Sequence, residues 1–257
     1  MLFRSEPRKG NEGKRIAETS MGMINSVGLQ NPGVHEFIRH EIPFLRRYDL
    51  KIIANINGNT IEEYCEMAKI LDQEDVDSIE LNISCPNVKN GGLAFGTNPK
   101  VVQEVVAKVR KSTSKHLIVK LSPNVTDIKE IAHIVEAEGA NCISMINTVT
   151  GMAIDIHARK TVLKRGSGGL SGPAIKPIAI KLVHDVFHTV KIPILGMGGI
   201  MSGDDVVEFM LAGASAVAIG TGNFVNPVLP QLTLEKLQEY LERYKYQSVR
   251  QLVGDLV

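Results

Sequence analysis

Cysteine is scarce in this sequence, and long apolar runs are absent. The 257 residues include three cysteines, and no two of them are spaced as a CxxC pair. The absence of such a pair excludes an iron–sulfur cluster or a structural zinc held by this chain alone. So few cysteines are typical of a protein from a reducing cytoplasm. No apolar run approaches the ~18 residues of a transmembrane helix, and the first residues lack the apolar core of a secretory signal. We therefore expect a cytoplasmic protein without a membrane anchor.

An excess of charge of either sign is also missing. The chain has 29 basic and 28 acidic residues and a formal net charge of +1, which gives no electrostatic basis for binding nucleic acid or an anionic membrane. The seven histidines are scattered, and we predict no metal site. A hydrophobic share of 44% in 257 residues suits one sizeable domain, at the length typical of a (β/α) barrel.

Strand and helix patterns alternate along most of the chain. Charged residues 1–20 predict a solvated arm, residues 21–33 an ordered loop, and residues 34–45 a helix. The expected strands span residues 51–55, 77–83, 116–121, 141–146, 192–195 and 215–219, and each precedes an expected helix. Such alternation predicts an α/β fold with a parallel sheet. We predict a (β/α)8 TIM barrel with about six βα units present, which leaves two units, roughly 60 residues, to be expected upstream.

One strand leads into an unusual cysteine loop, the stretch ELNISCPNVKNGG from Glu80 to Gly92. It places Cys85 at the carboxyl end of a strand, between the amides of Asn82 and Asn87. Chemistry in α/β enzymes is found at strand ends. The alternative is an inert, buried cysteine, which is what we expect of Cys65 on the inner face of the helix that begins after Thr60. The amides, Pro86 and two glycines favour a functional thiol.

Further polar and glycine residues follow the other strands. They are Lys120, Asn147, Thr148, Gly198, Gly199, Gly220 and Thr221. A lysine at a strand end favours an anionic partner, although it could also extend to the surface. Glycine loops expose backbone N–H groups that hold phosphate, although they could be ordinary turns. Asn147 could cap the long, glycine-rich loop predicted at residues 149–172, which is either a binding or lid segment or an insertion without a role.

The chain carries a series of motifs: NSVGLQNPG from Asn25, NISCPN from Asn82, VKLSPN from Val119, INT from Ile146, GGLSGPAIKP from Gly168, GMGGI from Gly196 and AVAIGT from Ala216. Together these motifs resemble those of the cytosolic class 1 dihydroorotate dehydrogenases. The wording around VKLSPN is most similar to the NAD-dependent class 1B catalytic subunits. The match runs from about Arg15 nearly to the end of the chain.

The resemblance implies an FMN-bound barrel that oxidises (S)-dihydroorotate to orotate in pyrimidine (UMP) biosynthesis. By the family pattern, Cys85 is the general base and the hydride goes to the flavin. The implied substrate-binding residues are Asn25, Gly28, Leu29, Asn82, Asn87, Asn147 and Thr148. The implied FMN-binding residues are Asn82, Lys120, Ile146, Gly172, Gly198, Gly199, Gly220 and Thr221. It also implies a homodimer and a partner subunit that carries FAD and an iron–sulfur cluster.

The start of the chain departs from the family pattern. The family begins with a strand that ends in a small-residue loop, followed by a second strand that bears a lysine, and neither pattern is found here. We therefore expect residues 1–257 to form a single FMN-binding barrel domain that is incomplete at its N-terminus. Two alternatives stay open: a non-catalytic remnant without flavin, and an FMN barrel oxidoreductase that acts on another dihydropyrimidine.

Overall fold

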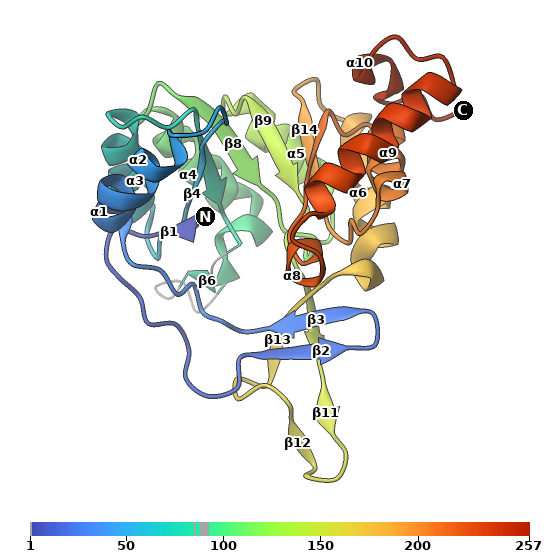
Figure 1. Cartoon of the computed structure of the whole chain (residues 1–257). Helices are drawn as coiled ribbons and strands as arrows, with labels where there is room; N and C mark the ends of the chain where they lie inside the picture. The colour runs from blue at the N-terminus through green and yellow to red at the C-terminus, as the bar shows by residue number, and fades with distance from the viewer. Residues whose placement is uncertain (1, 85, 88–92) are drawn as a thin grey trace. The chain divides into compact units, whose positions relative to one another are not determined.

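The computed structural model describes residues 2–84, 86–87 and 93–257. The chain forms two compact units: Met1–Asn11 with Val27–Ile143, and Glu12–Ser26 with Ser144–Val257. Six strands, β4, β5, β8, β9, β14 and β15, are each followed along the chain by a helix (Figure 1). The prediction of an α/β fold with about six βα units of a (β/α)8 barrel is confirmed.

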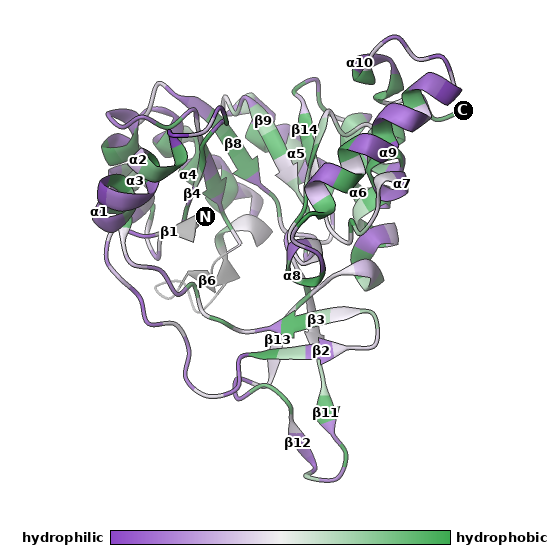
Figure 2. Cartoon of the chain, in the orientation of Figure 1, coloured by the Kyte–Doolittle hydropathy of each residue, from purple (hydrophilic) through white to green (hydrophobic). Residues whose placement is uncertain are grey.

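Parallel strands form the centre of the first unit. They are ordered β1 (Leu2–Phe3), β4 (Ile53–Ile56), β5 (Ser78–Asn82) and β8 (His116–Lys120). The helices α3 (Ile61–Asp72), α4 (Pro99–Arg110) and α5 (Ile128–Ala137) pack in sequence, α3 on α4 and α4 on α5. Each apolar stripe faces inward: Val102, Val105, Val106 and Val109 of α4 are fully buried. Figure 2 shows the resulting contrast between apolar strands such as β8 and polar outer helix faces.

The helix starts follow the predicted capping chemistry. Thr60 Oγ1 accepts a hydrogen bond from the backbone N–H of Glu63, and Asp127 Oδ1 accepts one from Lys129. Residues 34–45 are helical as predicted, as α1 (Val34–Glu36), a π turn (Phe37–Glu41) and α2 (Ile42–Leu45). Cys65 is only half-buried, so its placement in the core was wrong. The buried stripe of α3 runs instead along Tyr64, Met67, Ala68 and Leu71.

The prediction of a solvated arm for residues 1–20 is also wrong. β1 pairs with β4 in parallel. Arg4 is buried, and its guanidinium donates a hydrogen bond to Glu63 Oε2 at 2.9 Å. Further along, β2 (Ile16–Thr19) pairs with β3 (Gly22–Asn25). These pairings join residues far apart in sequence or residues with little apolar content, so local composition does not reveal them.

The second unit combines βα units with an antiparallel sheet. β9 (Cys142–Met145) begins in the first unit and ends in the second. In the second unit, β14 (Ile194–Met197) pairs in parallel with β15 (Ala216–Ala218). Its helical elements are a 3-10 turn (Pro173–Ile175), α6 (Lys176–Phe187), α7 (Gly203–Leu211), α8 (Gly222–Val225), α9 (Leu229–Arg243) and α10 (Val249–Leu252).

The segment 149–172 is an ordered hairpin, so its prediction as a loop is wrong. β10 (Val149–Met152) pairs with β13 (Ser167–Ser171), and β11 (Ile154–Asp155) with β12 (Lys160–Thr161) extends that hairpin (Figure 1). β13 also pairs with β3, which completes a four-stranded sheet. A Cβ at Gly168 would lie 2.4 Å from the carbonyl oxygen of Asn25, so glycine is what lets the two strands approach. This glycine content concealed the strand in the sequence.

Neither a membrane-spanning helix nor a cluster of metal ligands is found among the described residues. No helix in that part of the chain is long and apolar enough to cross a membrane. His184 lies in α6, and His188, four residues later, is the C-cap of that helix. The Nδ1 atom of His188 lies 2.8 Å from the carbonyl oxygen of His184. Across residues 2–84, 86–87 and 93–257 no group of three His, Cys, Asp or Glu side chains could hold a metal ion.

The contacts of Asp77 predict that its contribution to the free energy of unfolding is lost in acid. Its carboxylate accepts a hydrogen bond from the backbone N–H of Ile52 and pairs with Arg46 and Lys51, which lowers its pKa to about 2. A carboxyl whose pKa is lowered by folding stabilises the protein above its unfolded pKa, and that contribution disappears as the pH falls. We expect the stability advantage of the wild type over Asp77→Asn, measured by urea unfolding, to shrink between about pH 4 and pH 2. Glu104→Gln, at an exposed carboxylate, is the control; an advantage independent of pH would contradict the prediction.

Candidate functional site

Polar side chains gather where the strands of the first unit end. Asn57 directly follows β4, Asn82 is the last residue of β5, and Lys120 is the last residue of β8. Asn82 and Lys120 are cross-strand partners in the parallel register. The structure therefore brings together two of the residues predicted to bind cofactor, and adds an asparagine that sequence reasoning missed.

Both the backbone carbonyl and the side chain of Asn82 accept hydrogen bonds. Its side chain is buried, and its carbonyl oxygen accepts hydrogen bonds from the Tyr64 hydroxyl at 2.7 Å and from Asn57 Nδ2 at 3.2 Å. Its Oδ1 accepts from the backbone N–H of Ser84 at 3.2 Å. These bonds fix the backbone at the point where β5 leads to residue 85. Cys85 itself lies outside the described residues.

Lys120 has an anionic neighbour within the chain. Its Nζ lies 4.0 Å from Glu80 Oε2, with side-chain exposures of 20% and 9%. The carboxylate of Glu80 also accepts a hydrogen bond from Asn55 Nδ2. Within the chain, Lys120 is thus paired with Glu80, a residue that the sequence analysis did not select, and the anionic ligand expected of Lys120 stays a prediction.

Three buried polar atoms in this region have no hydrogen-bond partner among the described residues. They are Asn55 Oδ1, Asn57 Oδ1 and Ser84 Oγ. Asn55 is 8% exposed and Asn57 is 1% exposed. A buried acceptor without a donor costs about 1–3 kcal/mol, and such atoms are rare unless a ligand or water serves them. The two amide oxygens are therefore suited to a ligand that offers N–H donors.

The remaining first-unit predictions fall on a loop and on a short strand. Gly28 has φ +78° and Leu29 has φ 60°, and a Cβ at Gly28 would lie 2.6 Å from the side chain of Asn11. Only a glycine fits at position 28 without displacing that side chain. Asn87 belongs to the short strand β6 (Pro86–Asn87), which pairs with β7 (Leu93–Ala94).

In the second unit, predicted substrate residues lie near the β3–β13 pair. Asn25 ends β3, and its Nδ2 donates to the carbonyl oxygen of Gly169 at 3.3 Å. A Cβ at Gly169 would lie 2.2 Å from Thr148 Oγ1, so Thr148 packs directly against this glycine. Asn147 Oδ1 accepts from the backbone N–H of Thr148 at 2.8 Å. The structure thus brings Asn25 and Thr148 to the same glycine of β13.

Three predicted glycines form a tightly packed cluster in the second unit. Gly172, Gly198 and Gly199 have φ of +97°, +127° and +87°. A Cβ at Gly199 would lie 2.9 Å from the carbonyl oxygen of Gly172 and 2.7 Å from Lys176 Cβ, and one at Gly198 would lie 3.2 Å from Ile146 Cγ1. The backbone N–H of Ile146 donates to the Met197 carbonyl oxygen at 2.9 Å. The cluster therefore joins four of the predicted cofactor residues in one compact arrangement, which we call the glycine cradle: Ile146, Gly172, Gly198 and Gly199.

Gly220 and Thr221 follow β15. An added Cβ at Gly220 would meet no heavy atom within 4 Å. Thr221 Oγ1 donates to Ser171 Oγ at 2.8 Å, which ties this loop to the end of β13. Gly220 is therefore an open position, unlike the three packed glycines of the cradle.

A signal for the missed residues was present in the sequence. Asn55 and Asn57 are two apart, as are Glu80 and Asn82, and residues with that spacing share one face of a strand. Polar residues at every second position of otherwise apolar strands indicate a polar interior face. The hydroxyl of Tyr64, in contrast, lies on a helix stripe typical of an apolar core.

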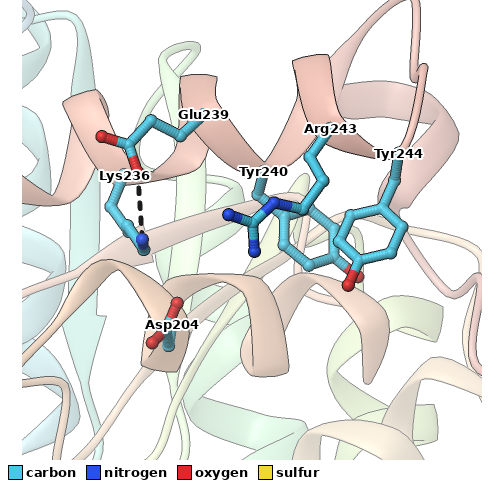
Figure 3. Close-up of a pocket in the computed structure, with 6 residues that line it drawn as sticks. All are labelled: Asp204, Lys236, Glu239, Tyr240, Arg243 and Tyr244. Carbon is cyan, nitrogen blue, oxygen red and sulfur yellow. Dashed lines mark hydrogen bonds and ion pairs between the residues drawn. The ribbon is translucent and has the colours of Figure 1, made fainter.

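One pocket of the second unit contains none of the predicted residues. It lies between α7 and α9 and is lined by Asp204, Lys236, Glu239, Tyr240, Arg243 and Tyr244 (Figure 3). Lys236 Nζ and Glu239 Oε2 pair at 3.0 Å across one turn of α9. Lys236 and Glu239 thus neutralise each other within the pocket.

Comparison with known proteins adds a family match. A family profile described as "Dihydroorotate dehydrogenase" matches residues 3–241. The "Dihydroorotate dehydrogenase B (NAD(+)), catalytic subunit" of Alkaliphilus metalliredigens (strain QYMF) is 58% identical over 252 residues, covering 98% of this chain and 83% of the relative. The proteins of that name from Alkaliphilus oremlandii (strain OhILAs) and Thermoanaerobacter pseudethanolicus (strain ATCC 33223 / 39E) are 55% and 52% identical, with 98% and 97% of this chain covered and 83% of each relative.

Proposed function

Because this chain belongs to the dihydroorotate dehydrogenase family of oxidoreductases, we propose that it oxidises (S)-dihydroorotate to orotate in pyrimidine biosynthesis. The observation that carries the proposal is the family match, which spans residues 3–241. The resemblance predicted from the motifs, to class 1 and within it to the NAD-dependent class 1B, is confirmed by these comparisons. The reaction removes a proton from C5 and a hydride from C6 of the ring, and a C5–C6 double bond forms.

Cys85 is the proposed general base. Its thiolate would take the C5 proton onto Sγ, and a free thiol with a pKa of ~8.5 is too weakly ionised near neutral pH without activation. The support for this role is its place three residues after Asn82, whose backbone is fixed by Tyr64 and Asn57.

Residues of both units fit an FMN cofactor, each through a separate feature. In the first unit, the Lys120 ammonium is the proposed contact of the flavin N1–O2 edge, and the orphaned amide oxygens of Asn55 and Asn57 are acceptors for ring N–H groups. In the second unit, the glycine cradle with Gly220 and Thr221 is the proposed holder of ring and phosphate. FMN, when bound, supplies the hydride acceptor. A Cβ at Gly198 or Gly199 would meet neighbouring atoms of the chain itself, so the packing of the cradle requires glycine at both positions.

The proposed substrate contacts are amides and small loop residues. Asn82 and Asn87, with the Gly28–Leu29 loop, are assigned to the ring from the first unit, and Asn25, Asn147 and Thr148 from the second. An amide carries both a donor and an acceptor, so it can match the ring's N–H and C=O groups as well as its carboxylate. The side chain of Asn25 is already oriented by its bond to Gly169.

We also propose that electrons leave through a partner. The relatives are named catalytic subunits of an NAD(+) enzyme, which supports a separate electron-transfer subunit. By the class 1B pattern that subunit carries FAD and an iron–sulfur cluster and passes electrons to NAD. The homodimer, and a single FMN-binding domain formed by residues 1–257, stay predictions.

The decisive experiment is to measure flavin in the purified chain. We expect about one FMN per chain, with an absorbance band near ~450 nm that bleaches when dihydroorotate is added without oxygen. Dihydrouracil, which lacks the carboxylate, is the matched control and should bleach the band far more slowly. A folded chain that takes up no FMN even when it is added would contradict the proposal and favour the non-catalytic remnant. Faster bleaching by dihydrouracil would favour another dihydropyrimidine substrate.

A further inference from the structure

Glu80 is a buried carboxylate to which the proposed reaction gives no task. It lies near the carboxyl end of β5, two residues before Asn82, and its side chain is 9% exposed. Burying a carboxylate is unfavourable unless it is paired and hydrogen-bonded. Here Asn55 donates to Oε2, and the Lys120 ammonium lies 4.0 Å from that same oxygen. Three adjacent strands, β4, β5 and β8, therefore each supply one of these polar side chains.

The separation of the charges indicates what these side chains can do. A distance of 4.0 Å between Nζ and Oε2 is too long for a hydrogen bond. It is short enough for strong Coulomb attraction where water is largely excluded. Glu80 thus attracts the ammonium without using its N–H donors, and no hydrogen bond joins Nζ to another described residue. Those donors stay available for an external acceptor.

We propose that Glu80 is a positioning residue for Lys120. Its carboxylate, oriented by Asn55, keeps the ammonium at the end of β8, with its N–H donors directed to the carbonyl and ring-nitrogen edge of an isoalloxazine. The inference rests on the proposed function, because it takes FMN as the ligand of Lys120. It adds that the cation acts as half of a partly buried pair, so that its placement depends on a residue that need not touch the flavin.

The first test is a double-mutant cycle on FMN affinity. We expect Glu80→Gln to weaken FMN binding about tenfold, the effect of one misplaced charged hydrogen bond. In a Lys120→Met background the same change should alter the affinity less than about twofold, because the residue that it positions is gone. Glu104→Gln is the matched control, since Glu104 pairs with Lys108 on an exposed helix face at 2.7 Å. It should leave FMN affinity unchanged. Tenfold losses in both backgrounds would show that Glu80 acts on the fold alone.

The second test is the midpoint potential of the bound flavin. Lys120→Met should lower it, because negative charge on the reduced ring loses a cation. If Glu80 positions that cation, Glu80→Gln should lower the potential too. An unchanged potential would overturn the inference, and so would a raised one, which would show that Glu80 merely opposes the charge of Lys120.

Two further variants keep the test decisive if Glu80→Gln folds poorly. The double variant Glu80→Gln/Lys120→Met removes both charges of the pair, which is often tolerated where removal of one is not. Glu80→Asp keeps the charge but withdraws it by one methylene, so affinity and potential should fall between those of wild type and Lys120→Met. Wild-type values for Glu80→Asp would contradict the positioning role. If the wild type binds no FMN, the proposed function itself fails; if it binds FMN and all Glu80 variants match it, only this inference fails.

Discussion

Replacing Cys85 with alanine should slow the reduction of bound FMN by dihydroorotate about a thousandfold while the FMN content stays unchanged. General-base catalysis typically contributes between about a hundredfold and ten-thousandfold. Alanine removes the group that takes the C5 proton and leaves the flavin contacts in place. The measurement is a single-turnover reduction followed by the flavin absorbance in an anaerobic stopped-flow instrument. It reports the chemical step without any contribution from the electron-transfer partner.

The chain supplies its own controls for this experiment. Cys65 is half-buried on α3 and Cys142 is buried in β9. Cys65→Ala and Cys142→Ala should each reduce FMN at a rate within about twofold of wild type, because neither follows a strand end that bears the substrate amides. Reduction by Cys85→Ala within tenfold of the wild-type rate would assign the proton to another group. Loss of FMN from Cys85→Ala would instead show that this loop is needed for cofactor binding.

The second large effect is expected at Gly199. Alanine there adopts φ +87° with a Cβ 2.7 Å from Lys176 Cβ and 2.9 Å from the Gly172 carbonyl oxygen. The backbone strain and the overpacking together should lower the free energy of unfolding by about 3 kcal/mol. The loop after β14 must then move away from Gly172, and FMN affinity should fall about a hundredfold as charged contacts to phosphate are lost. Urea unfolding of the FMN-free protein and FMN titration measure the two effects separately.

Gly166 provides the matched control for backbone strain. It also has a left-handed φ, +86°, but an added Cβ would meet nothing within 4 Å. Gly166→Ala should therefore cost about 1 kcal/mol from its backbone conformation alone and leave FMN affinity unchanged. If both variants lose the same stability, the packing at the cradle carries no weight. If Gly199→Ala keeps the wild-type FMN affinity, the cradle does not hold the cofactor.

The helices and parallel strands were predictable because local chemistry specifies them. Thr60 and Asp127 cap the helices that follow them, and the valine stripe of α4 is buried as its spacing requires. The antiparallel sheet was not predictable. Its strands are rich in glycine, and β13 pairs with β3, whose residues come more than 140 positions earlier, as the bond between Asn25 and Gly169 shows. No local pattern records such a partner.

Residues of the candidate site were predictable where they belong to a sequence motif. They were not predictable where their role depends on side chains of the neighbouring strands. Asn82 and Lys120 were selected from strand-end position and resemblance, and they are cross-strand partners. Glu80 was missed because a charged residue inside a strand is usually assigned to solvent. Its role becomes visible only when β4 and β8 place Asn55 and Lys120 beside it.

The pairing of β3 with β13 also affects how the protein emerges from the ribosome. β3 is synthesised before β13, and 144 residues separate Asn25 from its partner Gly169. At about 5–20 residues per second, β3 waits roughly 7–30 s for that partner. During that interval β2 can pair with β3, but the opposite edge of β3 stays open to pairing with other chains.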